Sequence, residues 1–190
     1  MKSFFTEIYD KLLWGIEGSG GGSTIKNTVV YRRYLQRFLK IKHIKTIIDY
    51  GCGDWQSTQL INFDGIEYLG IDCVDSVIEK NIINYEQDNI TFLVLDEMKD
   101  FFSYTADLLI LKDVLQHWTI DEINYFLTNV KDNFKFILIT NSSHQTVDNE
   151  EYNNRSRPLS ANFEPLKTYN CKIVLKYMAD NQKETSLIEK

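Results

Sequence analysis

The stretch that most constrains the fold is residues 46–55, with the sequence Thr-Ile-Ile-Asp-Tyr-Gly-Cys-Gly-Asp-Trp. An apolar, β-branched run that reaches a carboxylate, Asp49, and then a Gly-x-Gly turn is typical of a buried parallel strand followed by a ligand-binding loop. Gly51 and Gly53 let the backbone adopt positive φ and approach a bound molecule. We therefore expect a ligand at the end of this strand.

A second apolar run, residues 66–72, ends in Asp72 about twenty residues later, from where a carboxylate reaches the hydroxyl groups of a ribose. This spacing predicts a nucleoside ligand. The pyrophosphate of a dinucleotide would face Asp49 and Asp54, and like charges at ~4 Å repel by about 4 kcal/mol at an effective dielectric of ~20. Gln56 also replaces the third glycine of the dinucleotide fingerprint. The charges favour a cationic nucleoside, such as S-adenosylmethionine.

Four motifs follow one another along the chain: Ile-Ile-Asp-Tyr-Gly-Cys-Gly at 47–53, Leu-Gly-Ile-Asp at 69–72, Phe-Leu-Val-Leu-Asp at 92–96 and Asp-Leu-Leu-Ile-Leu-Lys-Asp-Val-Leu-Gln-His at 107–117. Over most of the chain, they resemble the successive motifs of class I S-adenosylmethionine-dependent methyltransferases. The resemblance implies a doubly wound α/β fold whose mostly parallel, seven-stranded Rossmann-like sheet ends in a C-terminal antiparallel hairpin. It also implies S-adenosylmethionine as cofactor and S-adenosylhomocysteine as product.

The 190 residues are expected to form a single methyltransferase domain around one core. Residues 1–44 would hold N-terminal helices and a glycine-rich loop, 45–140 the cofactor-binding core, and 141–190 a substrate loop and the closing hairpin. Amphipathic helices are predicted at 3–14, with Phe5 on the apolar face, and from Asn27, the expected N-cap, to about residue 42, with Val30 on the apolar side. A helix is predicted at 75–85 with Ile83 on its apolar side, and Thr119 with Glu122 forms a capping box that opens another helix. Strands are predicted at 134–140, 171–178 and 185–189, with a turn at 180–182 between the last two. The glycine-rich residues 15–23 match a segment that similar methyltransferases carry before the first strand, although a flexible linker is the alternative.

The resemblance places the cofactor at the strand ends and against the glycine-rich segment. Asp72 is expected to hold the ribose, and Asp96 the adenine amino group unless it caps a helix. Cys73 is expected beside the adenine, or else is a small buried apolar residue. The expected cofactor contacts are Asp49, Gly51, Cys52, Gly53, Asp72, Cys73, Asp96, Glu97, Met98, Lys112, Trp14, Ser19, Gly20 and Ser23.

Methyl transfer to a hydroxyl group requires alignment and a base. Asp113 and His117 are the candidate catalytic residues because both follow the fourth strand, although His117 has an alternative interpretation as a packing residue. Arg157, Trp118 and Asn141 are the candidate substrate contacts. Asp113 and Asn141 end neighbouring strands and would suit Mg²⁺, but the further carboxylate of magnesium-dependent relatives is missing, so we expect no metal.

With 21 basic and 27 acidic residues, the chain has a net charge of −6 and a pI near 5.1. This charge disfavours nucleic acid and anionic membranes as partners. No apolar run approaches the ~20 residues of a membrane helix, so a cytoplasmic location is expected. We expect O-methylation of a small molecule or a glycan. The alternatives are a non-catalytic cofactor-binding partner subunit and a nicotinamide-dependent oxidoreductase.

Overall fold

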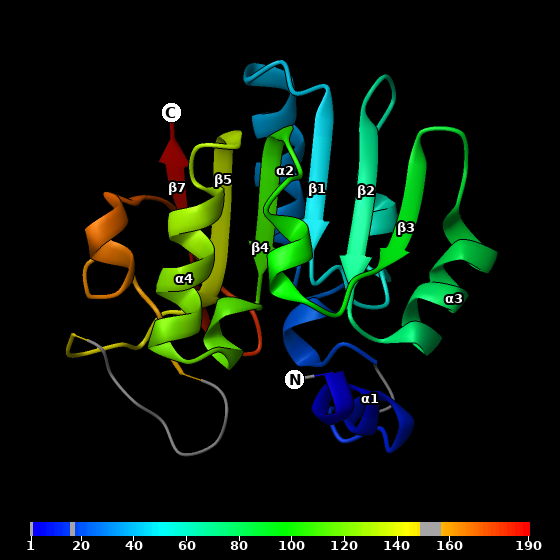
Figure 1. The fold of residues 1–190 in the computed structure, drawn as a ribbon, viewed down its shortest axis with the longest axis horizontal. Helices are drawn as coiled ribbons and strands as arrows, with labels where there is room; N and C mark the ends of the chain where they lie inside the picture. Colours follow the sequence, from blue (N-terminus) through cyan, green and yellow to red (C-terminus); the bar gives the residue numbers. More distant parts are fainter. Residues whose placement is uncertain (1, 16–17, 149–156) are drawn as a thin grey trace.

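Seven strands form one sheet in the order β3-β2-β1-β4-β5-β7-β6 (Figure 1). The computed structural model describes residues 2–15, 18–148 and 157–190. The strands are β1 (Thr46–Tyr50), β2 (Glu67–Asp72), β3 (Ile90–Val94), β4 (Ala106–Lys112), β5 (Phe134–Ser142), β6 (Lys172–Met178) and β7 (Gln182–Glu189). The first five are parallel, and β7 lies antiparallel between β5 and β6. The expected fold class is therefore confirmed.

Two strands, β5 of the parallel core and β7 of the hairpin, extend further than the sequence pattern indicated. β5 was expected to end at Thr140 but continues to Ser142, and β7 begins at Gln182 rather than Thr185. The two extensions pair with each other, with Ser142 opposite Lys183. Backbone hydrogen bonds carry the ladder past the point where apolar alternation stops. The longer strands bring the start of β7 to the ligand-binding edge.

In the described part of the chain, four α-helices and five short 3₁₀ turns precede or connect the strands. They are α1 (Lys2–Asp10), η1 (Gly21–Ser23), α2 (Val29–Ile41), η2 (Thr58–Leu60), α3 (Asp75–Tyr85), η3 (Met98–Phe101), η4 (Leu115–His117), α4 (Ile120–Val130) and η5 (Leu166–Tyr169). Helices α2 and α4 cover opposite faces of the sheet (Figure 1). On β1, Ile47 packs with the α2 cluster and its neighbour Ile48 with the α4 cluster. Such a strand is buried on both faces, as expected for a parallel sheet.

Two details of the second helix correct the sequence-based prediction. Its N-cap is Thr28 rather than Asn27, and the Asn27 side chain instead donates a 2.8 Å hydrogen bond to the carbonyl oxygen of Gly21. Val30, expected on the apolar side, is 44% exposed, whereas Tyr31 is 4% exposed. The buried stripe follows Tyr31, Leu35 and Phe38 because these residues share one helix face at the 3.6-residue period.

Other boundaries are close to those expected. Helix α3 has the predicted bounds, although Ile83 is 81% exposed rather than packed. Helix α1 stops at Asp10, four residues earlier than predicted, and turns follow. The predicted capping box of α4 is confirmed, because Thr119 and Glu122 each bind the other's backbone N–H.

Candidate active site

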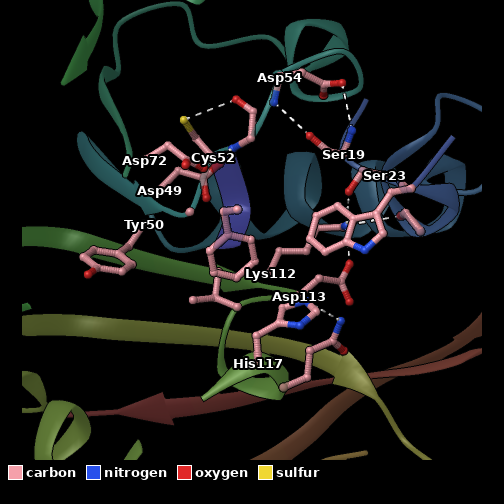
Figure 2. Close-up of a pocket in the computed structure, with 18 of the residues that line it drawn as sticks. Ser19, Ser23, Asp49, Tyr50, Cys52, Asp54, Asp72, Lys112, Asp113 and His117 are labelled. Atoms are coloured by element: carbon pink, nitrogen blue, oxygen red, sulfur yellow. Dashed lines mark hydrogen bonds and ion pairs between the residues drawn. The ribbon is translucent and has the colours of Figure 1, made fainter. Parts of the chain in front are cut away.

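A cavity of about 370 Å³ opens at the carboxyl ends of β1, β2 and β4, within the usual size range of small-molecule sites (Figure 2). Parallel sheets bind ligands beyond these ends where the strand order reverses. The reversal here lies at β1, which pairs with β2 on one side and β4 on the other. Helix α1 lies beyond the same ends of β1 and β2 (Figure 1). The cavity therefore occupies the place that the fold provides for a ligand.

Asp49, near the end of β1, lines the cavity and is only 6% exposed. The hydroxyl group of Tyr68 donates a 2.7 Å hydrogen bond to its Oδ2. Burial raises the pKa of Asp49 to about 6 because few groups solvate the carboxylate. A cationic ligand group beside it would compensate this cost.

Asp72, at the end of β2, lies close to Asp49 (Figure 2). Its Oδ2 accepts a hydrogen bond from the backbone N–H of Gly53 and its Oδ1 one from that of Val74, both at 3.1 Å. Burial raises the pKa of Asp72, and these N–H groups oppose that shift. An ionised carboxylate has about four acceptor positions. Positions therefore remain on Asp72 for hydroxyl groups of a ligand.

At two positions, Gly51 and Gly53, the turn after β1 has no room for a side chain. Gly51 has φ +79°, and a Cβ added there would overlap Cγ2 of Val114. Gly53 has φ +57°, and its Cβ would overlap the Oγ of Ser19. The two glycines therefore allow the turn, the start of η4 and the glycine-rich segment to meet at the cavity.

The glycine-rich segment forms a wall of the cavity over its described residues 18–23. The backbone N–H of Ser19 donates to Asp54 Oδ2 at 3.1 Å, and the backbone N–H of Asp54 donates to Ser19 Oγ at 2.9 Å. The hydroxyl groups of Tyr9 and Ser19 are 2.8 Å apart. Reciprocal bonds of this kind hold α1, the segment and the β1 turn together, unlike a linker that makes no contacts.

At the end of β4, Asp113 lies between two lysines. Its Oδ2 is 2.7 Å from Lys112 Nζ and its Oδ1 is 2.8 Å from Lys183 Nζ. Lys112 also donates to the carbonyl oxygen of Gly22 at 3.2 Å and to Ser23 Oγ at 3.3 Å. Burial alone would raise the pKa of Asp113, but the two ammonium groups outweigh it and hold the pKa at about 2. This cluster fastens the glycine-rich segment to the sheet.

His117 closes the other side of the cavity, next to aromatic residues of the N-terminal region. Its ring stacks on Trp14 at 5.5 Å between centroids and meets Phe5 edge-to-face at 5.6 Å. Gln116 Nε2 lies 3.4 Å from His117 Nε2. The imidazole is therefore held in one orientation, with both residues lining the cavity.

No family model matches the sequence, and no curated protein matches it either. Solved structures do match its architecture. The crystal structure of magnesium protoporphyrin IX methyltransferase (ChlM) from Synechocystis PCC 6803 with bound SAM gives a TM-score of 0.66 at 14% identity, covering 98% of this chain and 95% of that chain. The N-terminal domain of EvdMO1 in the presence of SAH and D-fucose gives 0.57 at 13% identity, covering 83% and 82%. The chain has the class I methyltransferase fold.

A third match shows the same fold within a longer protein. WbdD gives a TM-score of 0.62 at 15% identity, and the match covers 86% of this chain but 39% of that one. At such identities the likeness extends to the methyltransferase fold and not to a substrate.

Most of the residues expected at the site of this methyltransferase fold line one cavity. They are Trp14, Ser19, Gly20, Ser23, Asp49, Gly51, Cys52, Gly53, Asp72, Cys73, Asp96, Lys112, Asp113, His117 and Trp118. Asp96 forms an ion pair with Lys2 of α1, whose Nζ is 2.8 Å from Asp96 Oδ1. Four expected contacts lie outside the lining: Glu97, Met98, Asn141 and Arg157. Arg157 is nevertheless close, because its backbone N–H donates to the carbonyl oxygen of Gln116 at 2.8 Å.

Several residues that line the cavity were not predicted as site residues: Phe5, Tyr9, Gln116, Ser142, Asp180, Asn181 and Lys183. Phe5 had been noted only as part of an apolar helix face. Gln116 directly precedes His117, a candidate base, and this position was the one local indication that Gln116 could belong to the site. Lys183 lies between the turn predicted at 180–182 and the strand predicted from 185, and its pairing with Ser142 brings it to the site.

The described residues contain no group of three histidine, cysteine, aspartate or glutamate side chains arranged to hold a metal ion. Asn141, proposed above as a neighbour of Asp113, is 1% exposed, and its Oδ1 has no hydrogen-bond partner in the described structure. Among the described helices, none is both long and apolar enough to cross a membrane.

Proposed function

We propose that this protein is an S-adenosylmethionine-dependent methyltransferase that methylates an oxygen atom of a small molecule or a glycan. The observation that carries the proposal is the pair Asp49 and Asp72, which line one cavity at the switch point of a class I methyltransferase fold. Among the described residues, the buried carboxylate of Asp49 forms no ion pair, and Asp72 has acceptor positions left for hydroxyl groups.

The residues present fit this cofactor. The turn at Gly51 gives close access to the backbone, Asp49 would face the positively charged methionine part, and Asp72 would bind the ribose hydroxyl groups. Asp96 would accept a hydrogen bond from the adenine amino group in competition with Lys2. When bound, the cofactor supplies an electrophilic methyl group on a sulfonium. The protein then has to orient the acceptor, exclude water and remove a proton.

Of the two candidate bases, His117 suits proton removal. An imidazole changes protonation near neutral pH, and His117 lines the cavity. Asp113 has a pKa of about 2 and an ammonium group on each oxygen, so it is a poor base at neutral pH. We assign Asp113 the role of holding Lys112 and Lys183, and His117 the role of base.

The acceptor would bind between η4 and the segment that follows β5. Trp118 lines this part of the cavity and is 3% exposed. Arg157 follows the undescribed residues and is held to η4 through its backbone. Contact of Trp118, Arg157 and Asn141 with the acceptor stays a prediction, as does the cytoplasmic location. A net charge of −6 supports a small-molecule or glycan acceptor over a nucleic acid.

Calorimetric titration with S-adenosylhomocysteine tests the proposal. Wild-type protein should bind it at micromolar concentration, and Asp72→Ala should weaken binding by roughly 1–3 kcal/mol through lost charge-assisted hydrogen bonds. Asp88→Ala is the matched control, because Asp88 is exposed at the opposite end of β3. Its affinity should equal that of the wild type.

Folded, ligand-free wild-type protein that fails to bind S-adenosylhomocysteine would contradict the proposal. Titration with NADH tests the oxidoreductase alternative, and tight binding there would favour it. His117→Ala distinguishes an enzyme from a non-catalytic subunit: it should keep cofactor binding and lose methyl transfer to any acceptor that the wild type methylates.

A further inference from the structure

Gln116 joins the end of β5 to the candidate base. Its side chain is 7% exposed and lies between Ser142 and His117. The backbone N–H of Ser142 donates to Gln116 Oε1 at 3.2 Å, and Gln116 Nε2 lies 3.4 Å from His117 Nε2. The carbonyl oxygen of Gln116 also accepts the backbone N–H of Arg157 at 2.8 Å. The residue is thus held at both its main chain and its side chain.

These contacts determine which way the amide points. A backbone N–H only donates, so the amide atom facing Ser142 has to be the oxygen. The amide NH₂ group then faces His117, and it also only donates. His117 Nε2 therefore has to accept, which means that it carries a lone pair and that the neutral ring has its proton on Nδ1.

The His117 ring is fixed by other contacts as well. It belongs to η4, whose first residue Leu115 is fully buried. Trp14 stacks on one side at an interplanar angle of 28°, and Phe5 meets the ring at 83°. A ring held in this way keeps Nε2 directed toward the amide.

We propose that Gln116 is a positioning residue that keeps the Nε2 lone pair of His117 available to the acceptor, and that the acceptor is therefore a neutral hydroxyl group. This inference rests on the proposed function. At 3.4 Å the bond from Gln116 is beyond the usual range for N–H hydrogen bonds, so an incoming O–H donor displaces it at low cost. An anionic carboxylate or phosphate oxygen has no proton to donate to Nε2 and would meet a lone pair instead.

The proton and the electron pairs balance in this arrangement. The acceptor O–H bond breaks with its proton moving to His117 Nε2, an oxygen–methyl bond forms, and the methyl–sulfur bond breaks with its pair left on sulfur. The imidazolium then has N–H groups at both nitrogens, and its Nε2–H faces the NH₂ of Gln116. Two facing donors repel, which favours release of the proton to solvent before the next turnover.

Histidine ¹⁵N NMR of the ligand-free protein tests the tautomer directly. The chain has three histidines, so the His117 signals are assigned by their loss in His117→Ala. Above the histidine titration, wild-type protein should show an unprotonated Nε2 and a protonated Nδ1 at His117. Gln116→Glu keeps an oxygen for the Ser142 N–H but turns a second oxygen toward His117, so Nε2 should become protonated.

Gln36→Glu is the matched control. Gln36 Oε1 also accepts a backbone N–H, that of Asn62 at 2.7 Å, but Gln36 does not line the cavity. This variant should leave the His117 signals unchanged. A protonated Nε2 in the wild type, or no response in Gln116→Glu, would overturn the assignment of Gln116.

Binding of S-adenosylhomocysteine separates this inference from the proposed function. Gln116→Glu should bind it within about twofold of the wild type, because the amide contacts the base and not the two cofactor carboxylates. If the wild-type protein does not bind S-adenosylhomocysteine although Nε2 of His117 is unprotonated, the proposed function is overturned. The role of the lone pair in methyl transfer then falls with it. Intact binding together with a protonated Nε2 in the wild type, or with an unchanged tautomer in Gln116→Glu, would overturn the Gln116 assignment alone.

Discussion

The ammonium group of Lys183 lies 2.8 Å from Asp113 Oδ1, and the lysine side chain is 3% exposed, although the two residues are 70 positions apart in the chain. β7 supplies the lysine, and the chain just after β4 supplies the aspartate. Lys112 takes the second carboxylate oxygen and reaches the glycine-rich segment. The contact therefore connects the closing hairpin, the parallel core and the N-terminal wall of the cavity.

Lys183→Met should lower the free energy of unfolding by roughly 3 kcal/mol. This is the low end of the range for a broken buried ion pair, because Lys112 still faces Asp113. Urea denaturation with an unchanged m value measures the loss. Lys135→Met is the control: Lys135 is 71% exposed and pairs with Asp107, so the change should stay below about 1 kcal/mol. Equal losses in both variants would argue against a buried, stabilising pair.

Acid should remove the contribution of Asp113. Its pKa in the folded protein is about 2, below the ordinary value of 3.8, so the ionised form stabilises the folded state above pH 3.8. That contribution, about 2 kcal/mol, is lost as the pH falls from 3.8 toward 2. Lys183→Met should flatten this part of the stability curve. Lys190→Met is the control and should leave the curve unchanged, because Lys190 donates to a backbone carbonyl oxygen. An unchanged curve in Lys183→Met would contradict the lowered pKa of Asp113.

Asp49 should make cofactor binding depend on pH near pH 6, above the range in which Asp113 titrates. Its raised pKa of about 6 means that its protonated form stabilises the folded state at low pH, and that this contribution is lost as the pH rises through 6. A ligand ammonium group binds the carboxylate form, so affinity for S-adenosylhomocysteine should fall about tenfold per pH unit below about pH 6. Calorimetry from pH 5 to 7 measures this slope. Asp49→Asn should abolish it and Asp88→Asn should retain it, while a flat wild-type profile would be inconsistent with this role.

Comparison of Gly51→Ala with Gly65→Ala separates the effect of backbone strain on stability from the effect of the β1 turn on cofactor binding. Both glycines have positive φ, +79° and +69°, so each alanine should cost roughly 1–2 kcal/mol of stability. Only at Gly51 would the Cβ overlap Val114, whereas nothing lies within 4 Å at Gly65. Gly51→Ala should also weaken S-adenosylhomocysteine binding more than tenfold, and Gly65→Ala should leave it unchanged. Thermal unfolding and calorimetry measure the two effects, and equal binding by the two variants would show that the turn is not the cofactor site.

Features encoded by neighbouring residues could be predicted. The strand that reaches Asp49 and the turn at Gly51 are contiguous, and the capping box of Thr119 and Glu122 spans one helical turn. Parallel pairing then brings the ends of separate strands together, so Asp72 could be expected beside Asp49. The order of the motifs along the chain was therefore enough to predict that Asp49, Gly51 and Asp72 line one cavity.

Other features depended on packing that no local pattern encodes. Val30 and Tyr31 are both apolar in character, and the contacts of α2 with the sheet decide which one is buried. Glu97 and Met98 follow the third strand as expected, yet neither residue lines the cavity. Exposure of an apolar side chain is set by its neighbours, which come from distant parts of the chain.

The sequence by itself determined the succession of strands and helices in the parallel core, the Gly-x-Gly turn after β1 and the carboxylates at the ends of β1 and β2, because apolar periodicity and turn preference act over a few residues. Only the tertiary structure decided that Lys183 reaches Asp113, that Gln116 faces His117, and that the glycine-rich segment closes the cavity. Each of these contacts depends on strand register or on closure of a long loop. A one-residue shift of β7 would turn Lys183 to the other face of the sheet and remove the pair.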